Sequence, residues 1–366
     1  MTVRAPHVLV MAGGTGGHVF PGLALAEALR DRGFRVSWLG TERGIEASLV
    51  PRSGIELHTL PIAGLRGKGF ASRLLAPWRL AFSLWGALFL MLRLRPQVVV
   101  GFGGFASGPG GLMASALGRP LLIHEQNAVA GLTNRWLAKI AEQVFAGFPG
   151  SFPESVRYRT IGNPVRREIR QLPEPGQRWT GREGRLRLLV LGGSRGARTL
   201  NRIVPAALAL GAMETRPQVR HQAGELTLDL ALESYRGAGV DAEVTAFIEN
   251  MPEAYGWADL VICRAGALTV AEIAAAGLPA ILVPYPHAVD DHQTENARFL
   301  VGAGAAWCIQ DADLTPESLH GLLSGMDRVS LLDRAERARA EGSMDATGEL
   351  VAACIDALPA NWRGSI

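Results

Sequence analysis

The sequence predicts an α/β protein with two doubly wound, Rossmann-like domains, and three observations carry this prediction. The chain has 366 residues, which exceeds one ordinary hydrophobic core and suits two domains. Hydrophobic residues make up 48% of it and charged residues 19%, as in folded globular proteins. A unit of apolar strand, glycine-rich loop and apolar-periodic helix occurs twice, at residues 8–29 and 186–210. Repeated units of this kind build parallel sheets.

The first domain is predicted to span residues 1–165. Its strands are expected at residues 8–11, 36–39, 97–100, 120–123 and 144–146, and its helices at 19–29 and 131–140. Polar or glycine-rich loops follow three of these strands, at 13–18, 101–108 and 124–127. Open parallel sheets bind ligands at the carboxyl ends of their strands, so these three loops are the candidate binding loops.

Residues 166–187 break this pattern, because they are rich in proline, glycine and charged residues and lack hydrophobic periodicity. We interpret them as the region between the domains, and we predict a second domain over residues 166–342. Its strands are expected at 186–191, 219–222, 244–247, 260–263, 280–283 and 306–309, and its helices at 197–210, 269–276, 291–300 and 317–323. The segment 343–366 contains an amphipathic helix at 346–358, which we expect to pack back on the first domain.

The loop after the first strand, GGTGGH at residues 13–18, has the composition of an anion site. Its glycines let the backbone turn sharply and let a ligand approach closely. The helix that follows directs free N–H groups and the positive end of its dipole at such a ligand. A tight turn without any ligand is the alternative interpretation.

The two glycine loops do not match the common nucleotide-binding motifs. Neither GGTGGH at 13–18 nor GGSRGA at 192–197 fits G-x-G-x-x-G, and no G-x-x-x-x-G-K-[ST] occurs. The sequence therefore lacks the main motifs that would indicate an NAD-dependent enzyme or a P-loop NTPase. Two similar domains with phosphate loops facing a shared cleft indicate a nucleotide-sugar glycosyltransferase of the GT-B architecture.

The segment CRAGALTVAEIAAAG at 263–277 predicts a nucleotide site in the second domain. A strand ends near Cys263, a loop follows, and a helix is expected to begin near Thr269 with Glu272 just inside it. A carboxylate in this place can accept hydrogen bonds from both hydroxyls of a ribose, while loop amides hold a diphosphate. The alternative is structural, since Thr269 and Glu272 have the spacing of a capping box.

Other polar residues of the second domain have weaker signals. Gln293 and Asn296 could bind sugar hydroxyls. The acidic cluster Asp290, Asp291 and His292 is ordinary at a helix N-terminus. The D-x-D at 311–313 precedes a predicted helix start, so we interpret it as a loop and cap. We expect neither a metal nor another cofactor.

Charge and cysteine content narrow the choice of partners and compartment. The formal net charge of +3 is too small to indicate nucleic-acid binding, although the pI is about 9.0. The three cysteines, Cys263, Cys308 and Cys354, lie far apart and have neither metal nor redox spacing. A reduced cytoplasmic compartment is therefore expected.

An apolar segment at residues 80–92 is flanked by arginines, among them Arg73, Arg79 and Arg93. At 13 residues it is shorter than the roughly 20 that span a bilayer. One hypothesis is a helix packed on the first sheet. The other is a helix whose apolar surface and arginines dock on an anionic membrane, helped by the basic loop at 65–69.

Taken together, these residues resemble the MurG family, UDP-GlcNAc-dependent transferases that convert lipid I to lipid II in peptidoglycan synthesis. The matching stretches follow one order along nearly the whole chain: GGTGGHVFPGLALAEAL, WLGTERGIEASLVP, GLRGKG, GFGGFASGPGG, HEQNAVAGLTNRWLAKIA, GNPVR, GGSRGA, CRAGALTVAEIAAAGLPAILVPYP and DHQTENA. Two departures concern the donor site. Arg195 stands where the family often has glutamine, and Ala265 where it often has serine.

The resemblance implies that the second domain binds UDP-GlcNAc and that the first binds lipid I. The residues that it implies for the donor are Thr15, Gly16, Gly17, Asn127, Arg166, Ser194, Ile248, Ala267, Leu268, Thr269, Val270, Ala271, Glu272 and Gln293. Those implied for the acceptor diphosphate are Gly13, Gly14, Gly103 and Gly104. It also implies a peripheral location on the cytoplasmic face of the cell membrane, with an anionic membrane surface and cell-wall synthesis proteins as partners.

The family inverts the anomeric carbon, so the resemblance implies one displacement in which the MurNAc C4 hydroxyl attacks and UDP leaves. His18 is the candidate base, since a helix N-terminus disfavours the imidazolium, and Glu125 is the second candidate. Helix N-termini and Arg166 can stabilise the leaving diphosphate. Two alternatives stay open: another GT-B enzyme, such as a diacylglycerol glycosyltransferase or a UDP-GlcNAc epimerase, and a non-catalytic membrane-associated scaffold.

Overall fold

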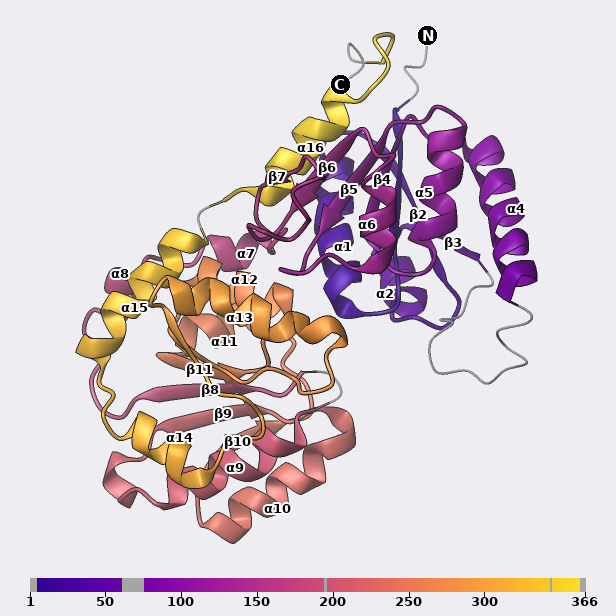
Figure 1. Cartoon of the computed structure of the whole chain (residues 1–366). Helices are drawn as coiled ribbons and strands as arrows, with labels where there is room; N and C mark the ends of the chain where they lie inside the picture. Colours follow the sequence, from indigo (N-terminus) through magenta and orange to yellow (C-terminus); the bar gives the residue numbers. More distant parts are fainter. Residues whose placement is uncertain (1–4, 61–75, 194–195, 343, 363–366) are drawn as a thin grey trace. The chain divides into compact units, whose positions relative to one another are not determined.

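The computed structural model describes residues 5–60, 76–193, 196–342 and 344–362 (Figure 1). The chain divides into two compact units. The first contains Met1–Pro164 together with Asp345–Ile366, and the second contains Val165–Met344. The predicted basic loop at 65–69 and its neighbour Arg73 lie outside the described residues.

The first unit is built on a seven-stranded parallel sheet with the strand order β3-β2-β1-β4-β5-β6-β7. Its strands are β1 (His7–Ala12), β2 (Arg35–Thr41), β3 (Glu56–Leu60), β4 (Val98–Gly103), β5 (Leu121–Glu125), β6 (Gln143–Ala146) and β7 (Arg159–Thr160). The order reverses between β1 and β4, so the loops after these two strands flank the switch point at which such sheets bind ligands.

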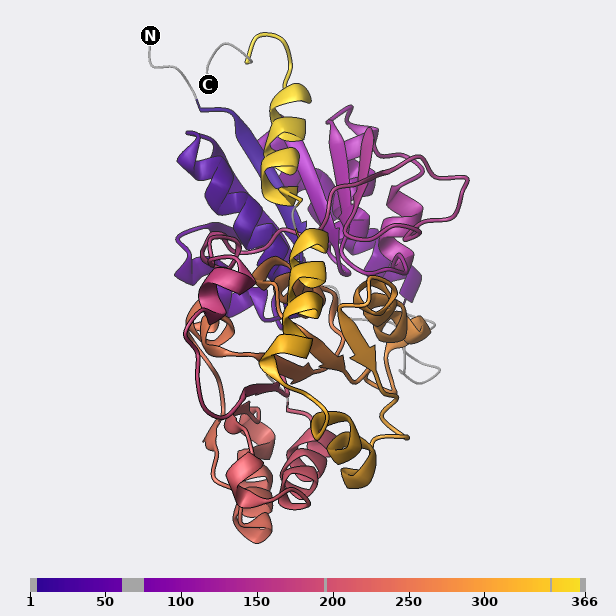
Figure 2. The same ribbon diagram turned by 90° about the vertical axis from the view of Figure 1, so that its left-hand side faces the viewer.

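Alternate residues of the first sheet enter two separate cores, because successive strand side chains point to opposite faces. Val8 and Val10 belong to the core beneath α1 (Gly16–Asp31) and α16 (Ala346–Asp356), which pack together (Figure 2). Leu9 and Met11 belong to the core of the opposite face. That face is covered by α4 (Ala76–Leu94), α5 (Ser107–Ala116) and α6 (Leu132–Leu137), while α2 (Glu46–Arg52) follows β2. The C-terminal segment is thus part of the first unit.

The second unit has a six-stranded parallel sheet with the order β10-β9-β8-β11-β12-β13. Its strands are β8 (Arg187–Leu191), β9 (Gln218–Gln222), β10 (Glu243–Thr245), β11 (Leu260–Cys263), β12 (Ala280–Leu282) and β13 (Ala306–Cys308). Its α-helices are α7 (Arg167–Arg170), α8 (Pro175–Trp179), α9 (Arg198–Ala209), α10 (Leu228–Ala238), α11 (Met251–Trp257), α12 (Ala267–Ala276), α13 (His292–Gly302), α14 (Pro316–Leu323) and α15 (Arg328–Glu341). The order reverses between β8 and β11, and α12 begins beside that point.

These two sheets confirm the predicted fold class, two doubly wound Rossmann-like domains. Several elements differ from the predictions. The glycine-rich segment 101–111 is not one loop, because β4 runs to Gly103 and α5 begins at Ser107. The irregular segment 166–187 contains the short helices α7 and α8. The elements that were not predicted include strands β3 and β7 and helices α2, α5, α10, α11 and α15.

Helix α4 satisfies the packing hypothesis on one face and leaves the other face open. Ala87, Leu90 and Met91 are buried in the core of the first sheet. The opposite face exposes Trp78, Phe82, Trp85 and Phe89 to between 67% and 71%. Among the residues that the structure describes, no helix is long and apolar enough to cross a membrane.

Candidate active site

The loop after β1 carries the start of α1 at the switch point of the first sheet. Thr15 is the N-cap residue with extended backbone angles, and α1 begins at Gly16. The Thr15 carbonyl accepts from the His18 and Val19 amides at 3.1 and 3.2 Å. The amides of Gly16 and Gly17 precede these bonds, so they belong to the free first turn that favours anions.

His18 is the third residue of α1, and its imidazole meets the loop after β5. Its Nδ1 lies 2.9 Å from the Gln126 Oε1 atom, across 108 residues of sequence. Among the described residues, Nε2 of His18 has no hydrogen-bond partner, and the side chain is partly exposed. The ring therefore has one nitrogen fixed by the protein and one open to a ligand.

Glu125, the second candidate base, has both carboxylate oxygens occupied. Oε1 accepts from the backbone and side-chain nitrogens of Asn127 at 2.9 and 3.1 Å. Oε2 accepts from the Asn134 side chain at 2.8 Å and from the Gly131 amide at 3.1 Å. The residue is 1% exposed. These bonds give Glu125 the role of holding the loop between β5 and α6 in place.

The glycines predicted for the acceptor diphosphate are mostly used for packing. Gly13 and Gly103 are buried, and the Gly14 amide donates to the Glu46 carboxylate at 3.0 Å. Gly104 has φ +88°, and a Cβ there would collide with the Gly13 carbonyl, so the loops after β1 and β4 touch at these glycines. The Gly14 amide is thus already bonded within the protein, although Gly14 is exposed, and Gly104 is partly exposed.

Glu46 is a site-supporting residue that the sequence analysis missed. It is fully buried at the start of α2, and its Oε1 accepts from the Thr41 amide and hydroxyl at 2.9 and 2.6 Å. Its Oε2 accepts from Gly14. A Cβ at Gly13 or Gly44 would collide with this carboxylate. Nothing local in the sequence identifies it, because a glutamate at a helix start is usually exposed.

In the second unit, α12 begins at Ala267 with Gly266 as its N-cap. The helix therefore begins slightly before the predicted start near Thr269, because glycine serves as the cap in place of a side-chain oxygen. The Val270 amide donates to the Gly266 carbonyl at 2.9 Å, which leaves Ala267, Leu268 and Thr269 as the free first turn. Three free amides of this kind, at the carboxyl end of β11, are suited to an anion.

Glu272 lies in the second turn of α12, so the capping-box interpretation is wrong. Its Oε1 accepts from Arg166 Nη2 at 2.9 Å, and its Oε2 accepts from the Tyr255 hydroxyl at 3.1 Å. Tyr255 is completely buried, and burial, followed by the negative charge of Glu272, raises the pKa of this phenol well above its ordinary value. Tyr255 therefore stays protonated and donates. The Glu272 side chain is 17% exposed.

The polar cluster after β12 separates into structural and exposed residues. Asn296 is fully buried and donates to the Ala265 carbonyl at 3.1 Å, so it supports the loop before α12 and is not available to a sugar. Gln293 Oε1 accepts from the Tyr285 amide at 2.9 Å. Asp311 pairs with Arg264 and accepts from the Thr199 hydroxyl, and Thr315 caps α14. Among the described residues, no cluster of three histidine, cysteine or acidic side chains could hold a metal.

The remaining predicted residues are placed as follows. Ile248 lies partly exposed in the connection between β10 and α11, and Val270 and Ala271 continue α12. Ala265 is buried in the loop between β11 and α12. Ser194 and Arg195 lie outside the described residues.

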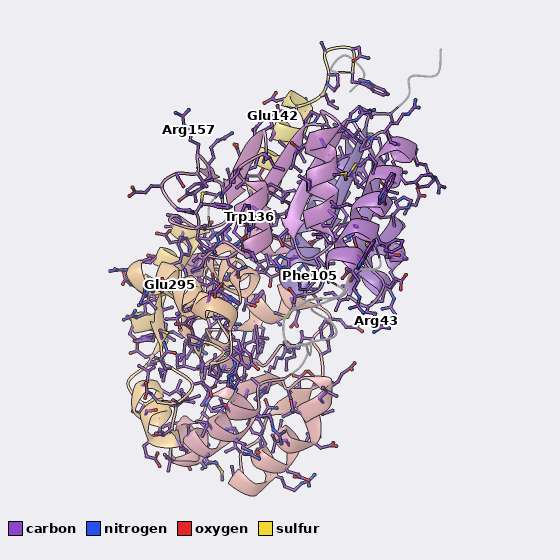
Figure 3. All side chains as sticks on the ribbon, turned by 45° about the vertical axis from the view of Figure 1, so that its right-hand side comes forward. Arg43, Phe105, Trp136, Glu142, Arg157 and Glu295 are labelled. Atoms are coloured by element: carbon purple, nitrogen blue, oxygen red, sulfur yellow. The ribbon has the colours of Figure 1, made fainter. Side chains whose placement is uncertain are left out.

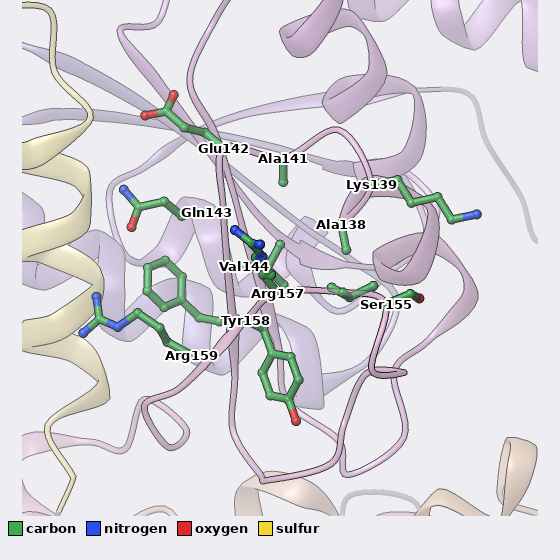
Figure 4. A pocket seen from close by; sticks show the side chains of 12 residues that line it. Ala138, Lys139, Ala141, Glu142, Gln143, Val144, Ser155, Arg157, Tyr158 and Arg159 are labelled. Atoms are coloured by element: carbon green, nitrogen blue, oxygen red, sulfur yellow. The ribbon is translucent and has the colours of Figure 1, made fainter.

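A separate cavity of about 650 Å³ lies at the β6–β7 edge of the first unit. Its lining includes Val144, Arg157 and Tyr158, and Figure 4 shows the side chains of Lys139 and Glu142 pointing away from Val144 and Arg157. No residue predicted for the donor, the acceptor diphosphate or the base lines it. We therefore place the candidate active site at the glycine loops and not in this cavity.

Two doubly wound units, each with an open helix N-terminus at its switch point, define a glycosyltransferase of the GT-B class. Models of the glycosyltransferase family 28 N-terminal and C-terminal domains match residues 8–146 and 187–349. The chain belongs to glycosyltransferase family 28.

Two curated relatives are similar over nearly their whole length. Both are named UDP-N-acetylglucosamine--N-acetylmuramyl-(pentapeptide) pyrophosphoryl-undecaprenol N-acetylglucosamine transferase. The protein of Marinobacter nauticus is 53% identical over 95% of this chain and 97% of its own. That of Chromohalobacter salexigens is 55% identical over 96% of both chains.

Solved structures agree with the fold. The crystal structure of Acinetobacter baumannii MurG has a TM-score of 0.83 and 40% identity, and the match covers 95% of this chain and 99% of that one. The calicheamicin glycosyltransferase CalG4 has a TM-score of 0.68 at 18% identity over 97% and 98% of the two chains. The second similarity concerns the fold alone.

Proposed function

We propose that this enzyme transfers N-acetylglucosamine from UDP-N-acetylglucosamine to the MurNAc C4 hydroxyl of undecaprenyl-pyrophosphoryl-MurNAc-pentapeptide, lipid I. The products are lipid II and UDP. The observation that carries the proposal is identity above 50%, over nearly the whole chain, to relatives named for this transfer. The same relatives do not favour a diacylglycerol glycosyltransferase, an epimerase or a non-catalytic scaffold.

The second unit is the proposed donor site. The open amides of Ala267, Leu268 and Thr269 suit the diphosphate, and the exposed edge of Glu272 suits the ribose. Arg166 is held beside Glu272 and can follow the departing diphosphate as charge develops on it. Other proposed donor contacts are Ser194, Ile248, Val270, Ala271 and Gln293, with Thr15, Gly16, Gly17 and Asn127 from the first unit.

The first unit is the proposed acceptor site, and His18 is the proposed base. The Nε2 atom of His18 is open, whereas both oxygens of Glu125 are saturated. The C4 hydroxyl loses its proton to Nε2 while its oxygen forms the bond to the anomeric carbon, and UDP leaves with the electron pair of the broken bond. Gly104 and the free first turn of α1 are the proposed contacts of the acceptor diphosphate.

The proposed reaction is tested by UDP release from UDP-N-acetylglucosamine with a lipid I analogue, with and without EDTA. We expect release that requires the analogue and yields the disaccharide product. Diacylglycerol and water serve as alternative acceptors in parallel reactions. Release with water alone, or a product with diacylglycerol and none with the lipid I analogue, would replace the proposal with one of the alternatives.

We further propose that the open face of α4 docks on an anionic membrane surface. Trp78, Phe82, Trp85 and Phe89 follow the i, i+4, i+7 spacing of one helix face. Helix α4 packs on α5, and α5 packs on α6. In α6, Trp136 is a further exposed aromatic residue, at 61% (Figure 3). The Lys139 ammonium lies 4.4 Å from the centre of its ring. Exposed arginines lie near both ends of α4, at Arg79 and at Arg93 and Arg95. Apolar side chains flanked by cations are the composition of an interfacial helix.

Replacing Phe82 and Trp85 together with serine is expected to weaken binding to anionic vesicles by about tenfold or more, because each ring contributes buried apolar area. Reversing the charge of Arg79 and Arg93 is expected to reduce binding by about fivefold per charge at low salt and less at high salt. Vesicle sedimentation measures both effects. Leu226→Ser, at an even more exposed apolar residue of the second unit, is the control. Unchanged binding in the α4 variants would leave α4 as a core helix alone.

Cell-wall synthesis proteins remain proposed partners. The location that follows from these proposals is peripheral, on the cytoplasmic face of the membrane.

A further inference from the structure

We propose that Gln126 and His124 are positioning residues that hold His18 in the tautomer with its proton on Nδ1. In that tautomer Nε2 presents a lone pair to the acceptor hydroxyl. The inference rests on the proposed role of His18 as the base. It concerns the chain of hydrogen bonds that runs from Gly162 through His124 and Gln126 to His18.

The chain begins at His124, whose protonation the surroundings determine. This residue is fully buried on β5, and its Nε2 lies 2.9 Å from the Gly162 carbonyl. A carbonyl only accepts, so Nε2 must carry a proton. Burial lowers the pKa of His124 to about 4, so the ring is neutral near pH 7. Its Nδ1 therefore carries a lone pair and acts as an acceptor.

The second step fixes the amide of Gln126. Its Nε2 lies 2.9 Å from the His124 carbonyl and 3.1 Å from His124 Nδ1. Both of these atoms are acceptors, so the NH₂ end of the amide must face them. The oxygen of the same amide, Oε1, consequently faces His18, and it must accept from Nδ1 at 2.9 Å.

Packing keeps this geometry in place. Gln126 is fully buried, and the Asn163 side chain donates to its backbone carbonyl at 3.0 Å. On the other side of the ring, a Cβ at Gly103 would lie 3.1 Å from His18 Cε1 and 3.2 Å from Nδ1. The His18 ring therefore lies close against the backbone of β4, with its Nδ1 edge toward Gln126. The Gln126 oxygen determines the tautomer, and the close approach of Gly103 limits movement of the ring.

This tautomer determines which nitrogen of His18 accepts the proton in the proposed reaction. The hydroxyl O–H bond breaks and the proton joins the Nε2 lone pair, while the Nδ1 proton remains donated to Gln126. Because Gln126 is an uncharged amide, it orients the ring without placing a negative charge beside it. In the opposite tautomer, Nε2 would carry a hydrogen and could not accept the hydroxyl proton.

The direct test measures the histidine tautomers in the wild-type protein. Long-range ¹⁵N–¹H correlation spectra of the full chain labelled with ¹⁵N-histidine report the protonated nitrogen of each of the eight histidines. His18→Gln identifies the His18 signals by their loss. We expect His18 protonated on Nδ1 and His124 protonated on Nε2 at neutral pH. A wild-type spectrum with His18 protonated on Nε2 would overturn the inference.

Two variants of Gln126 then separate positioning from a structural role. Gln126→Met keeps the shape but removes the acceptor, and we expect the His18 tautomer to shift toward Nε2–H and kcat to fall about tenfold with an unchanged donor KM. Gln126→Glu keeps an acceptor toward Nδ1 but places a second oxygen against the two acceptors of His124, so we expect it to keep the Nδ1–H tautomer and part of kcat while lowering the melting temperature. Unchanged tautomer or unchanged kcat in Gln126→Met would refute the positioning role.

The spectra use no substrate, so they stay informative if the proposed function fails. Wild-type protein that shows the expected tautomers but releases no UDP with the lipid I analogue would leave the hydrogen-bond chain intact and remove the reaction assigned to it. Activity that survives in His18→Ala would remove the base assignment in the same way.

Discussion

Replacing His18 with alanine is expected to lower kcat about 100- to 10,000-fold, the usual contribution of a positioned base, while the KM for UDP-N-acetylglucosamine changes little. Steady-state UDP release with saturating acceptor analogue measures the first effect. Varying the donor concentration in the same assay measures the second. We expect kcat to change without the donor KM because His18 lies in the first unit, whereas the proposed nucleotide contacts lie in the second.

Glu125 does not replace His18 in this expectation, because four donors already occupy its two oxygens. Glu125→Gln is the matched comparison. Glutamine retains one acceptor oxygen but places an NH₂ group against donors, so we expect a lower melting temperature and a disordered loop. The kcat loss in His18→Ala should be partly restored by added imidazole, whereas that in Glu125→Gln should not. Near-full turnover in His18→Ala would make the base assignment wrong.

The fold was largely predictable because parallel strands are buried on both faces and appear in sequence as short apolar runs. Strand β3 was missed because it lacks such an apolar run. It lies at the edge of the sheet and has the mixed sequence ELHTL. Helix α15 was missed because its fourteen residues, RVSLLDRAERARAE, are mostly polar and give little apolar periodicity. Neither of these two elements has a long apolar run in its sequence.

The position of the site on the backbone could be predicted from the sequence, but the hydrogen-bond partners of its side chains could not. The glycine loop and the apolar helix after it were sufficient to place His18 at a helix start. Its contact with Gln126 joins residues 108 positions apart, and a local pattern contains no information about such a pair. Glu46 could not be predicted for a similar reason. It accepts from the amide of Gly14, which lies in the loop after a different strand. A prediction of this kind requires the sheet order.

Replacing Glu272 with alanine is expected to raise the donor KM about 10- to 100-fold, because a carboxylate that binds hydroxyls contributes more than a neutral acceptor. Part of the loss is structural, since the alanine variant leaves the buried Tyr255 hydroxyl without its acceptor. Glu272→Gln is the matched control, because its amide oxygen can still accept from Tyr255 while the charge is lost. We expect an intermediate KM and a melting temperature closer to wild type.

The ribose contact is isolated by a cycle that combines these variants with 2′-deoxy and 3′-deoxy analogues of the donor. If Glu272 accepts from the ribose hydroxyls, removal of a hydroxyl weakens binding to the wild type and has little further effect on Glu272→Ala. Arg166 provides the second test, because Arg166→Ala releases Oε1 of Glu272 from its 2.9 Å bond and leaves the carboxylate in place. The deoxy effect should therefore persist in Arg166→Ala. Equal deoxy effects in wild type and Glu272→Ala would restrict Glu272 to holding Arg166 and Tyr255.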